Sequence, residues 1–141
     1  MAVSLGKKRV QDLSQFEEYG IGITLPLQIG NTGFTQSYKT IDQVKTNIKS
    51  LLLTRQQERV MQPFLGSGLN NLVFDFNDEE LANKIEETIN ESIQRWLPFV
   101  NVDRIDVEQT DVLRDQNRVN VSITFSIDGS ANLETIFLPI G

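Results

Sequence analysis

The strongest constraint on this fold is a helical pattern of apolar residues between positions 81 and 97. Apolar side chains recur there every three or four residues, which places them on one face of an α-helix. They are Leu81, Ile85, Ile89, Ile93, Trp96 and Leu97. Before this run, Asn77 followed by Glu80 forms a capping-box sequence, and Pro98 comes directly after it. The pattern therefore predicts a long amphipathic helix that must pack its apolar face against a second layer.

After this helix the apolar residues recur with the period of two that is typical of β-strands. Three such runs follow one another, at Ile105–Val107, Val119–Ile127 and Leu133–Leu138. The segments 115–117 and 128–129 separate the runs and have turn composition. Consecutive strands joined by short turns predict an antiparallel meander of three strands.

A second helix is expected upstream, from Ile41 to Leu53. Thr40 followed by Gln43 forms another capping box, and the apolar stripe consists of Ile41, Val44, Ile48, Leu51 and Leu52. Beyond it, residues 58–62 are predicted to form a short strand or an extended return. Gly66 and Gly68 permit a sharp change of direction before one helical turn at residues 69–74.

The first thirty residues give a weaker pattern. Residues 1–18 are predicted to form an arm that orders on a partner, or else a short helix around Val10, Leu13 and Phe16. The segment 20–30 alternates apolar and small residues, which indicates an extended conformation. Pro26 cannot donate a ladder hydrogen bond, so this segment should lie at a sheet edge or outside a sheet. We expect a single domain over residues 19–141.

Together these elements predict an α+β fold with two main helices packed on one face of a small antiparallel sheet. An extended N-terminal segment precedes them. A chain of 141 residues is long enough to bury a core without a disulfide or a metal.

The composition argues against several kinds of chemistry. The chain contains no cysteine and no histidine, so thiolate zinc sites and histidine acid–base catalysis are excluded. Glu58 could act as a lone acid, but glycoside hydrolysis needs two positioned carboxyl groups and the spacing identifies no second one. We therefore expect no catalytic residue, no metal and no cofactor.

Charge is unevenly distributed along the chain, although the formal net charge is −6. Residues 39–62 carry five basic and two acidic residues, a net charge of +3, whereas residues 75–115 carry four basic and twelve acidic residues, a net charge of −8. The overall charge argues against binding to nucleic acid or to an anionic membrane. No run has the length of a membrane span or the form of a signal peptide, so we expect a soluble protein of the cytosol.

Two segments are candidate interaction sites. The charged turn Arg55–Arg59 is either an ordinary solvated loop or a set of bidentate donors for a partner's carboxylates or carbonyls. The C-terminal run should lie at a sheet edge, where unpaired backbone groups can accept a strand from another chain. Its residues of interest are Leu133, Thr135, Ile136, Phe137 and Leu138.

Several segments, taken in order, resemble the small baseplate wedge proteins of contractile-tailed phages. They are GIG, LLLT with the following Arg, ERVMQP with the following Phe, GSGL and LVFDFND. The similarity extends from Tyr19 to Leu138 and is most specific between Leu51 and Phe74. Relatives of this family occur in the baseplates of type VI secretion systems and other contractile injection machines.

The resemblance implies a structural protein of the virion tail, assembled in the host cytoplasm. Members are present in six copies and contact the larger wedge proteins. Hub or tube proteins are further candidate partners. Members also initiate the sheath by offering strands to the sheath protein. Their Glu-Arg turn binds the helical core of the wedge, a role that here falls on Glu58 and Arg59, with Arg55 beside them. The family was once labelled lysozyme-like, but this sequence supplies no residues for that activity.

The sequence departs from the family pattern at three places. Gln57 stands where a glycine commonly precedes the glutamate, Val60 follows Arg59, and Leu65 lies between the aromatic residue and Gly66. The order around Arg59 favours the phage branch over the secretion-system branch. The fold superfamily also includes a bacterial anti-adaptor of the stress response, so a small regulatory adaptor is the alternative function.

Overall fold

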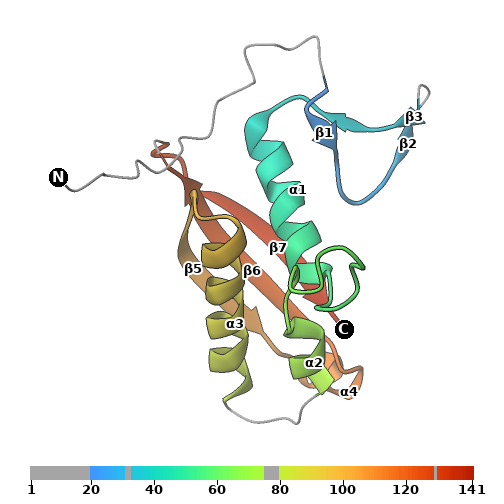
Figure 1. Ribbon diagram of the computed structural model, residues 1–141. Helices are drawn as coiled ribbons and strands as arrows, with labels where there is room; N and C mark the ends of the chain where they lie inside the picture. Colours follow the sequence, from blue (N-terminus) through green and yellow to red (C-terminus); the bar gives the residue numbers. More distant parts are fainter. Residues whose placement is uncertain (1–19, 31–32, 75–79, 129) are drawn as a thin grey trace, which may run out of the picture.

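The computed structural model describes residues 20–30, 33–74, 80–128 and 130–141 of the chain. Helices α1, α2 and α3 lie together on one side of the large sheet (Figure 1). The elements are β1 (Gly22–Ile23), β2 (Ile29–Gly30), β3 (Gly33–Phe34), β4 (Gln36–Ser37), α1 (Thr40–Leu53), α2 (Leu69–Phe74), α3 (Leu81–Trp96), β5 (Val100–Glu108), α4 (Asp111–Asp115), β6 (Val119–Ile127) and β7 (Glu134–Ile140). The predicted α+β fold with a C-terminal meander is confirmed; the predicted arm at residues 1–18 lies outside the described residues.

The large sheet has the strand order β5-β6-β7, and all its pairs are antiparallel. Ile123 in the central strand pairs with Ile105 on one side and with Ile136 on the other, which fixes the register. A register shift between Val102 and Arg104 marks a bulge in β5. In β6 every second residue is buried, which follows the period of two in the sequence. They are Val119, Val121, Ile123 and Phe125.

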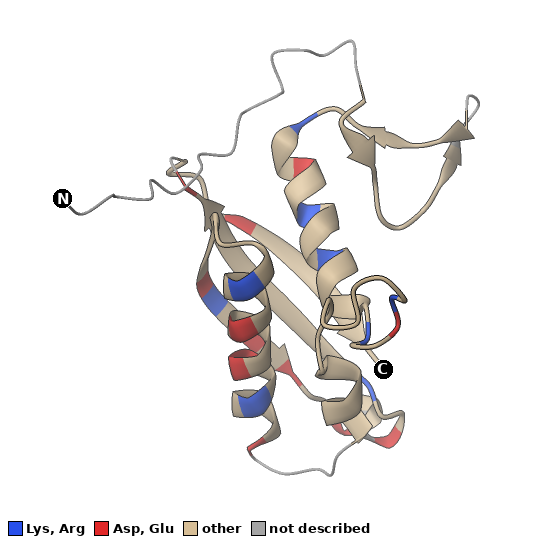
Figure 2. Cartoon of the chain, in the orientation of Figure 1, with Lys and Arg blue, Asp and Glu red and all other residues tan. Residues whose placement is uncertain are grey.

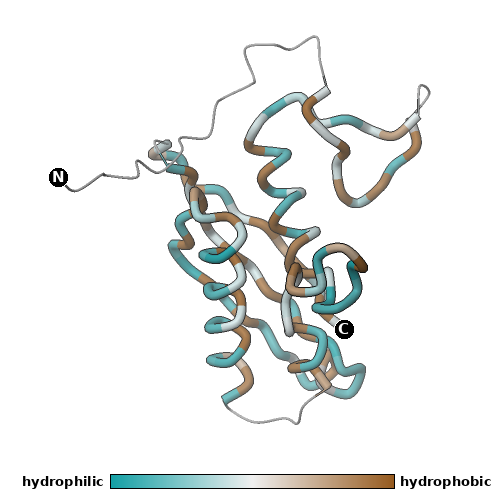
Figure 3. The backbone as a smooth tube through the Cα atoms, in the orientation of Figure 1, coloured by the Kyte–Doolittle hydropathy of each residue, from teal (hydrophilic) through white to brown (hydrophobic). Residues whose placement is uncertain are grey.

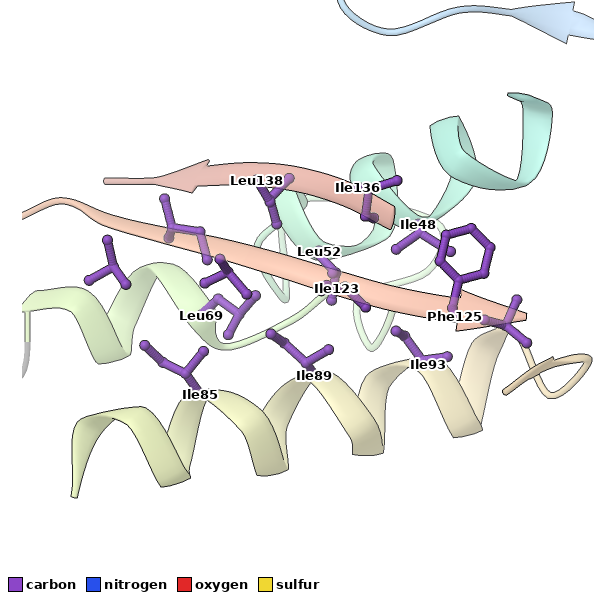
Figure 4. Close-up of a cluster of buried hydrophobic side chains, with 14 of the residues drawn as sticks. Ile48, Leu52, Leu69, Ile85, Ile89, Ile93, Ile123, Phe125, Ile136 and Leu138 are labelled. Carbon is purple, nitrogen blue, oxygen red and sulfur yellow. The ribbon is translucent and has the colours of Figure 1, made fainter. Parts of the chain in front are cut away.

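The core lies between this sheet and the helices. Ile85, Ile89 and Ile93 of α3 are fully buried, as is Ile48 of α1. Figure 4 shows these side chains pointing towards β6 and β7. Burying a side chain of this size stabilises the fold by about 1.5–3 kcal/mol, so these contacts hold both helices on one face of the sheet.

The opposite sheet face is not covered by any helix of the described part of the chain. It carries short polar side chains from β6, including Thr124, whose hydroxyl lies 3.1 Å from that of Thr135 in β7. Phe137 is the large apolar exception on this face and is 74% exposed. It lies beside Ser122, its partner in the ladder. The sheet therefore has one apolar covered face and one polar open face.

Residues 20–30 and 33–38 form a separate antiparallel ribbon, called the N-terminal ribbon below. β1 pairs with β4 and β2 pairs with β3. Between the two pairs, Thr35 N–H donates to Gln28 O (3.0 Å), and Thr24 N–H donates to Thr35 O (3.1 Å). The predicted extended conformation of 20–30 is confirmed, and Pro26 lies outside the paired strands. The sequence did not predict its partner strands, because residues 30–37 have the composition of a turn.

The start of α1 differs from the predicted capping box. The helix begins at Thr40 itself, and Lys39 occupies the N-cap position without a side-chain cap hydrogen bond. Gln43 does not complete the box, because its Oε1 accepts a hydrogen bond from Ser37 Oγ (2.5 Å) and its Nε2 donates to Asn47 Oδ1 (2.9 Å). Gln43 therefore joins the N-terminal ribbon to α1.

The described start of α3 lies four residues after the predicted cap residue, at Leu81. Glu80 occupies the N-cap position with helical backbone angles and makes no side-chain cap hydrogen bond. The other half of the predicted box, Asn77, lies outside the described residues. The helix itself confirms the apolar pattern and ends at Trp96, before Pro98.

Three further boundaries differ from the prediction. Helix α4 lies between the first two predicted strands, where only a turn at residues 115–117 was expected, and the chain leaves it through Asn117 at φ +51°. Strand β5 begins at Val100, five residues before the predicted run. Strand β7 leaves out Leu133 and includes Pro139, which pairs with Asn120 at the sheet edge.

Candidate functional site

The charged segment between α1 and α2 forms a closed loop over residues 54–68, called the 54–68 loop below. Its two ends are joined by a parallel bridge between Arg55 and Ser67. Ser67 N–H donates to Thr54 O (2.9 Å), and the buried Ser67 Oγ donates to Leu52 O (2.6 Å). This second bond satisfies a carbonyl at the C-terminal end of α1 that has no partner within the helix. The loop is therefore tied to the end of α1.

Inside the loop the backbone makes successive turns. Gln57 N–H donates to Pro63 O (2.7 Å) across the loop, and Leu65 N–H donates to Gln62 O (3.1 Å). Gln57 has a φ of +70°, which L-residues rarely adopt. The predicted strand or extended return at residues 58–62 is wrong, because these hydrogen bonds are made within the loop and not with a second strand.

The two loop glycines occupy different environments. Gly66 has a φ of +120°, and a Cβ atom added there would lie 2.4 Å from Thr54 O. Gly68 has no positive φ, and a Cβ atom there would meet open space. Gly66 is therefore required by the backbone path where the loop closes, whereas Gly68 is not.

Glu58 is bonded within the loop. Its Oε2 accepts a hydrogen bond from the backbone N–H of Arg55 (2.9 Å), and its own N–H donates to Arg55 O (3.2 Å). By contrast, within the described residues the guanidinium groups of Arg55 and Arg59 have no ion pair or hydrogen bond. Figure 2 shows these charges on the loop next to the C-terminal end of the chain. The glutamate holds the turn, and the arginines are available to a partner.

The structure distributes the three predicted residues between two hollows of the surface. Arg55 and Glu58 line an open hollow of about 680 Å³ that reaches the end of β7, where Pro139 and Gly141 form part of its wall. Arg59 instead lines a second hollow of about 230 Å³, called the Trp96 groove below. The loop therefore presents one arginine on each side.

The Trp96 groove lies between the C-terminal ends of α1 and α3. Its lining combines apolar and neutral polar side chains with one cation: Asn47, Ser50, Leu51, Thr54, Arg59, Leu65, Trp96 and Leu97. The sequence did not predict this groove. Trp96 belongs to the apolar stripe of its helix, and nothing in the sequence indicates that the end of α1 lies opposite.

The tip of the 54–68 loop is apolar and exposed. Val60 and Met61 are 95% and 92% exposed, and Phe64 is 70% exposed. Figure 3 shows apolar positions within this otherwise hydrophilic loop. Exposed apolar side chains beside unpaired arginines are typical of protein interfaces, which are enriched in aromatic residues, methionine and arginine.

The predicted edge-strand residues divide between the two faces of β7. Ile136 and Leu138 are buried in the core, whereas Thr135 and Phe137 belong to the open sheet face. Leu133 lies before the strand and is 58% exposed. In the described part of the chain, β7 pairs with no strand on its outer side. At its start, Glu134 forms an ion pair with Lys45 of α1 (2.7 Å).

A search of the part of the chain that the structure describes finds no group of three or more acidic, histidine or cysteine side chains that could hold a metal ion. None of the helices described is long and apolar enough to cross a membrane.

Comparison with protein families identifies the class of the protein. The sequence model of the family described as baseplate wedge protein gp25 matches residues 39–132, two-thirds of the chain. The chain therefore belongs to this baseplate wedge family. Membership gives it a structural role in a baseplate, as expected from the resemblance. A search of curated protein sequences finds no match.

Several solved structures have a similar fold. A crystal structure of a candidate tail lysozyme from Geobacter sulfurreducens has a TM-score of 0.64 and 20% identity, over 75% of this chain and 93% of that chain. A chain of the anti-feeding prophage baseplate has a TM-score of 0.55 and 18% identity, over 84% and 82%. A chain of the type VI secretion baseplate complex has a TM-score of 0.52 and 16% identity, over 70% and 90%. At these identities the likeness shows the shared fold.

Proposed function

We propose that this chain is a non-catalytic wedge subunit of a contractile tail baseplate that binds the larger wedge proteins through the 54–68 loop. The observation that carries the proposal is the construction of this loop. Its backbone is held by its own hydrogen bonds, while Arg55 and Arg59 have no ion pair within the described residues. Because the loop is already ordered, little conformational entropy is lost when a partner binds.

The loop residues have different parts in this proposal. Arg55 and Arg59 donate to carboxylates or carbonyls of the partner, since a guanidinium group forms two parallel hydrogen bonds with a carboxylate. Glu58 keeps the turn in shape by accepting from Arg55 N–H. The exposed side chains of Val60 and Met61 supply apolar contact area.

A second interface in the proposal is the outer edge of β7. A strand of the tail sheath protein adds to this edge, so that the subunit initiates the sheath from the baseplate. Phe137, exposed on the open sheet face, would lie beside the added strand. The protein then acts in six copies in the tail baseplate of the virion, after assembly in the host cytoplasm.

Co-expression with the larger wedge proteins of the same injection machine tests the first interface. We expect Arg55→Ala combined with Arg59→Ala to lower the yield of the co-purified complex at least about tenfold, the effect of losing one charge-assisted hydrogen bond. Arg104→Ala is the matched control, because this arginine is also exposed and its ion pair among the described residues is with Asp106, two positions along β5 (2.7 Å). Equal yields from the double variant and the wild type would refute the assigned interface.

Photocrosslinking tests the second interface. With p-benzoylphenylalanine in place of Phe137, we expect a crosslink to the sheath protein in assembling tails. The same photocrosslinker in place of Val112, which is 64% exposed in α4, serves as the control. A crosslink at position 112 with none at position 137 would exclude the β7 edge.

A further inference from the structure

The Trp96 groove presents hydrogen-bond donors with no acidic residue in its lining. Asn47 Oδ1 already accepts from Gln43 Nε2 (2.9 Å), which leaves the Asn47 amide hydrogens for a ligand. The Thr54 hydroxyl donates its hydrogen to Ser50 O (2.6 Å), so only its oxygen remains as an acceptor. The Trp96 indole N–H and the Arg59 guanidinium have no hydrogen-bond acceptor within the described residues. The groups left available in the groove are thus mainly donors.

One cation lies in this groove and a second lies beside it, although the chain as a whole is acidic. Arg59 belongs to the lining. Arg95 does not, but its guanidinium carbon lies 5.6 Å from the centre of the Trp96 ring. The ligand group that pairs with guanidinium groups and accepts hydrogen bonds from free donors is a carboxylate. Two cations are too few to hold a nucleic-acid backbone on a protein with a net charge of −6.

The remaining lining of the groove is apolar. Leu51 is buried, whereas Leu65, Trp96 and Leu97 are each partly exposed. Tryptophan and arginine are the residue types most enriched among interface hot spots, because they combine a large contact area with directional donors. A ligand that contacts both the apolar lining and the hydrogen-bond donors of the groove needs an apolar side chain and an adjacent carboxylate.

We propose that the Trp96 groove binds an acidic-apolar segment of a partner wedge protein. An apolar side chain of that segment packs against Leu65 and Trp96, and a neighbouring aspartate or glutamate accepts hydrogen bonds from Arg59. This inference rests on the proposed wedge function and adds a specific pocket with its required ligand chemistry. Trp96 and Asn47 then determine specificity alongside the charged loop.

Trp96 is the single tryptophan of the chain, so it can report on the groove directly. The full chain labelled with 5-fluorotryptophan gives one ¹⁹F resonance, which is followed while unlabelled wedge proteins from the same injection machine are added. Complex formation is measured independently by size-exclusion chromatography. We expect the resonance to shift or broaden in step with the amount of complex.

A blocking substitution provides the second measurement. Asn47→Glu places a carboxylate in the groove, where it competes for Arg59 and repels an acidic ligand. We expect it to weaken binding at least about tenfold, the scale of a like-charge conflict at an interface. Asn83→Glu, an exposed position near the start of α3, is the matched control and should bind as the wild type does. Circular dichroism should show the same melting curve for both variants.

The outcomes separate this inference from the proposed function. A complex whose ¹⁹F resonance stays at the free position, or that forms equally well with Asn47→Glu, would overturn the groove while the wedge function stands. Failure of the wild-type chain to form any complex with the wedge proteins would overturn both.

Discussion

The 54–68 loop and the N-terminal ribbon both expose apolar side chains, but they are built in different ways. The loop closes on itself: its ends are bridged, and the buried Ser67 ties it to the end of α1. The ribbon is held by pairs of two residues each, and Ser37 joins it to α1 through Gln43. The loop carries three charged residues, whereas residues 20–38 contain no charged residue.

This difference shows two ways of presenting an apolar surface. In the loop, Val60 and Met61 are almost fully exposed, on a backbone held by hydrogen bonds within the loop. In the ribbon, Leu27 and Ile29 are 60% and 84% exposed, and Ile29 belongs to a sheet of two strands. Isolated two-stranded ribbons are marginally stable in water. The conformation of the loop should therefore depend on its own backbone geometry. The conformation of the ribbon should depend on a small number of contacts.

The largest expected effect is on closure of the loop. Gly66→Ala should lower the free energy of unfolding by about 2–4 kcal/mol, because the φ of +120° strains an L-residue and its Cβ would meet Thr54 O. Gly68→Ala is the matched control and should change it by less than about 0.5 kcal/mol. Urea denaturation measures both. Equal values for the two variants would show that the loop does not depend on a left-handed residue.

A smaller effect is expected for two of the buried serines, Ser67 and Ser37. Ser67→Ala should cost about 1–2 kcal/mol, because it leaves Leu52 O without its donor in a buried position. Ser37→Ala should cost about 0.5 kcal/mol, because Gln43 is half-exposed and can bind water instead. Both hydroxyl groups belong to residues that are 2% exposed, so burial alone predicts equal losses. Thermal unfolding monitored by circular dichroism decides between these expectations.

The smallest expected effect lies in the ribbon. Ile29→Ser should change the free energy of unfolding by less than about 0.5 kcal/mol, because the side chain is 84% exposed and only its pair with Phe34 is lost. The midpoint of urea denaturation provides the measurement, with Ile89→Ala as a positive control that should cost about 2–5 kcal/mol. A loss above 1 kcal/mol for Ile29→Ser would mean that the ribbon contributes to the domain core.

Much of the fold could be predicted because its long elements have strong periodicity. The apolar stripe of α3 and the alternation in β6 each involve enough residues to fix both the type of element and its buried face. Helix α4 has five residues, too few for a helical period to be recognised. The capping box at Thr40 failed because Ser37, which becomes a neighbour only after folding, takes the side chain of Gln43.

The candidate site was less predictable because its contacts form between residues that become neighbours only after folding. The spacing of Arg55, Glu58 and Arg59 indicates a charged turn, but their hydrogen bonds depend on how the loop closes. Nothing local shows that Glu58 binds the backbone of Arg55, or that Arg59 lies on the opposite side of the loop from Arg55. Trp96 becomes part of a groove only through packing of two helix ends that are about forty residues apart in sequence.

The two outer strands of the large sheet are chemically unequal, and this gives the subunit a direction. β5 is interrupted by a bulge after Val102 and carries Asp103, Arg104 and Asp106 close together, features that discourage pairing with a further strand. The opposite strand, β7, has a regular ladder to β6 from Phe125 to Val119. If a strand of another chain is added to this sheet, we therefore expect it at β7 and not at β5.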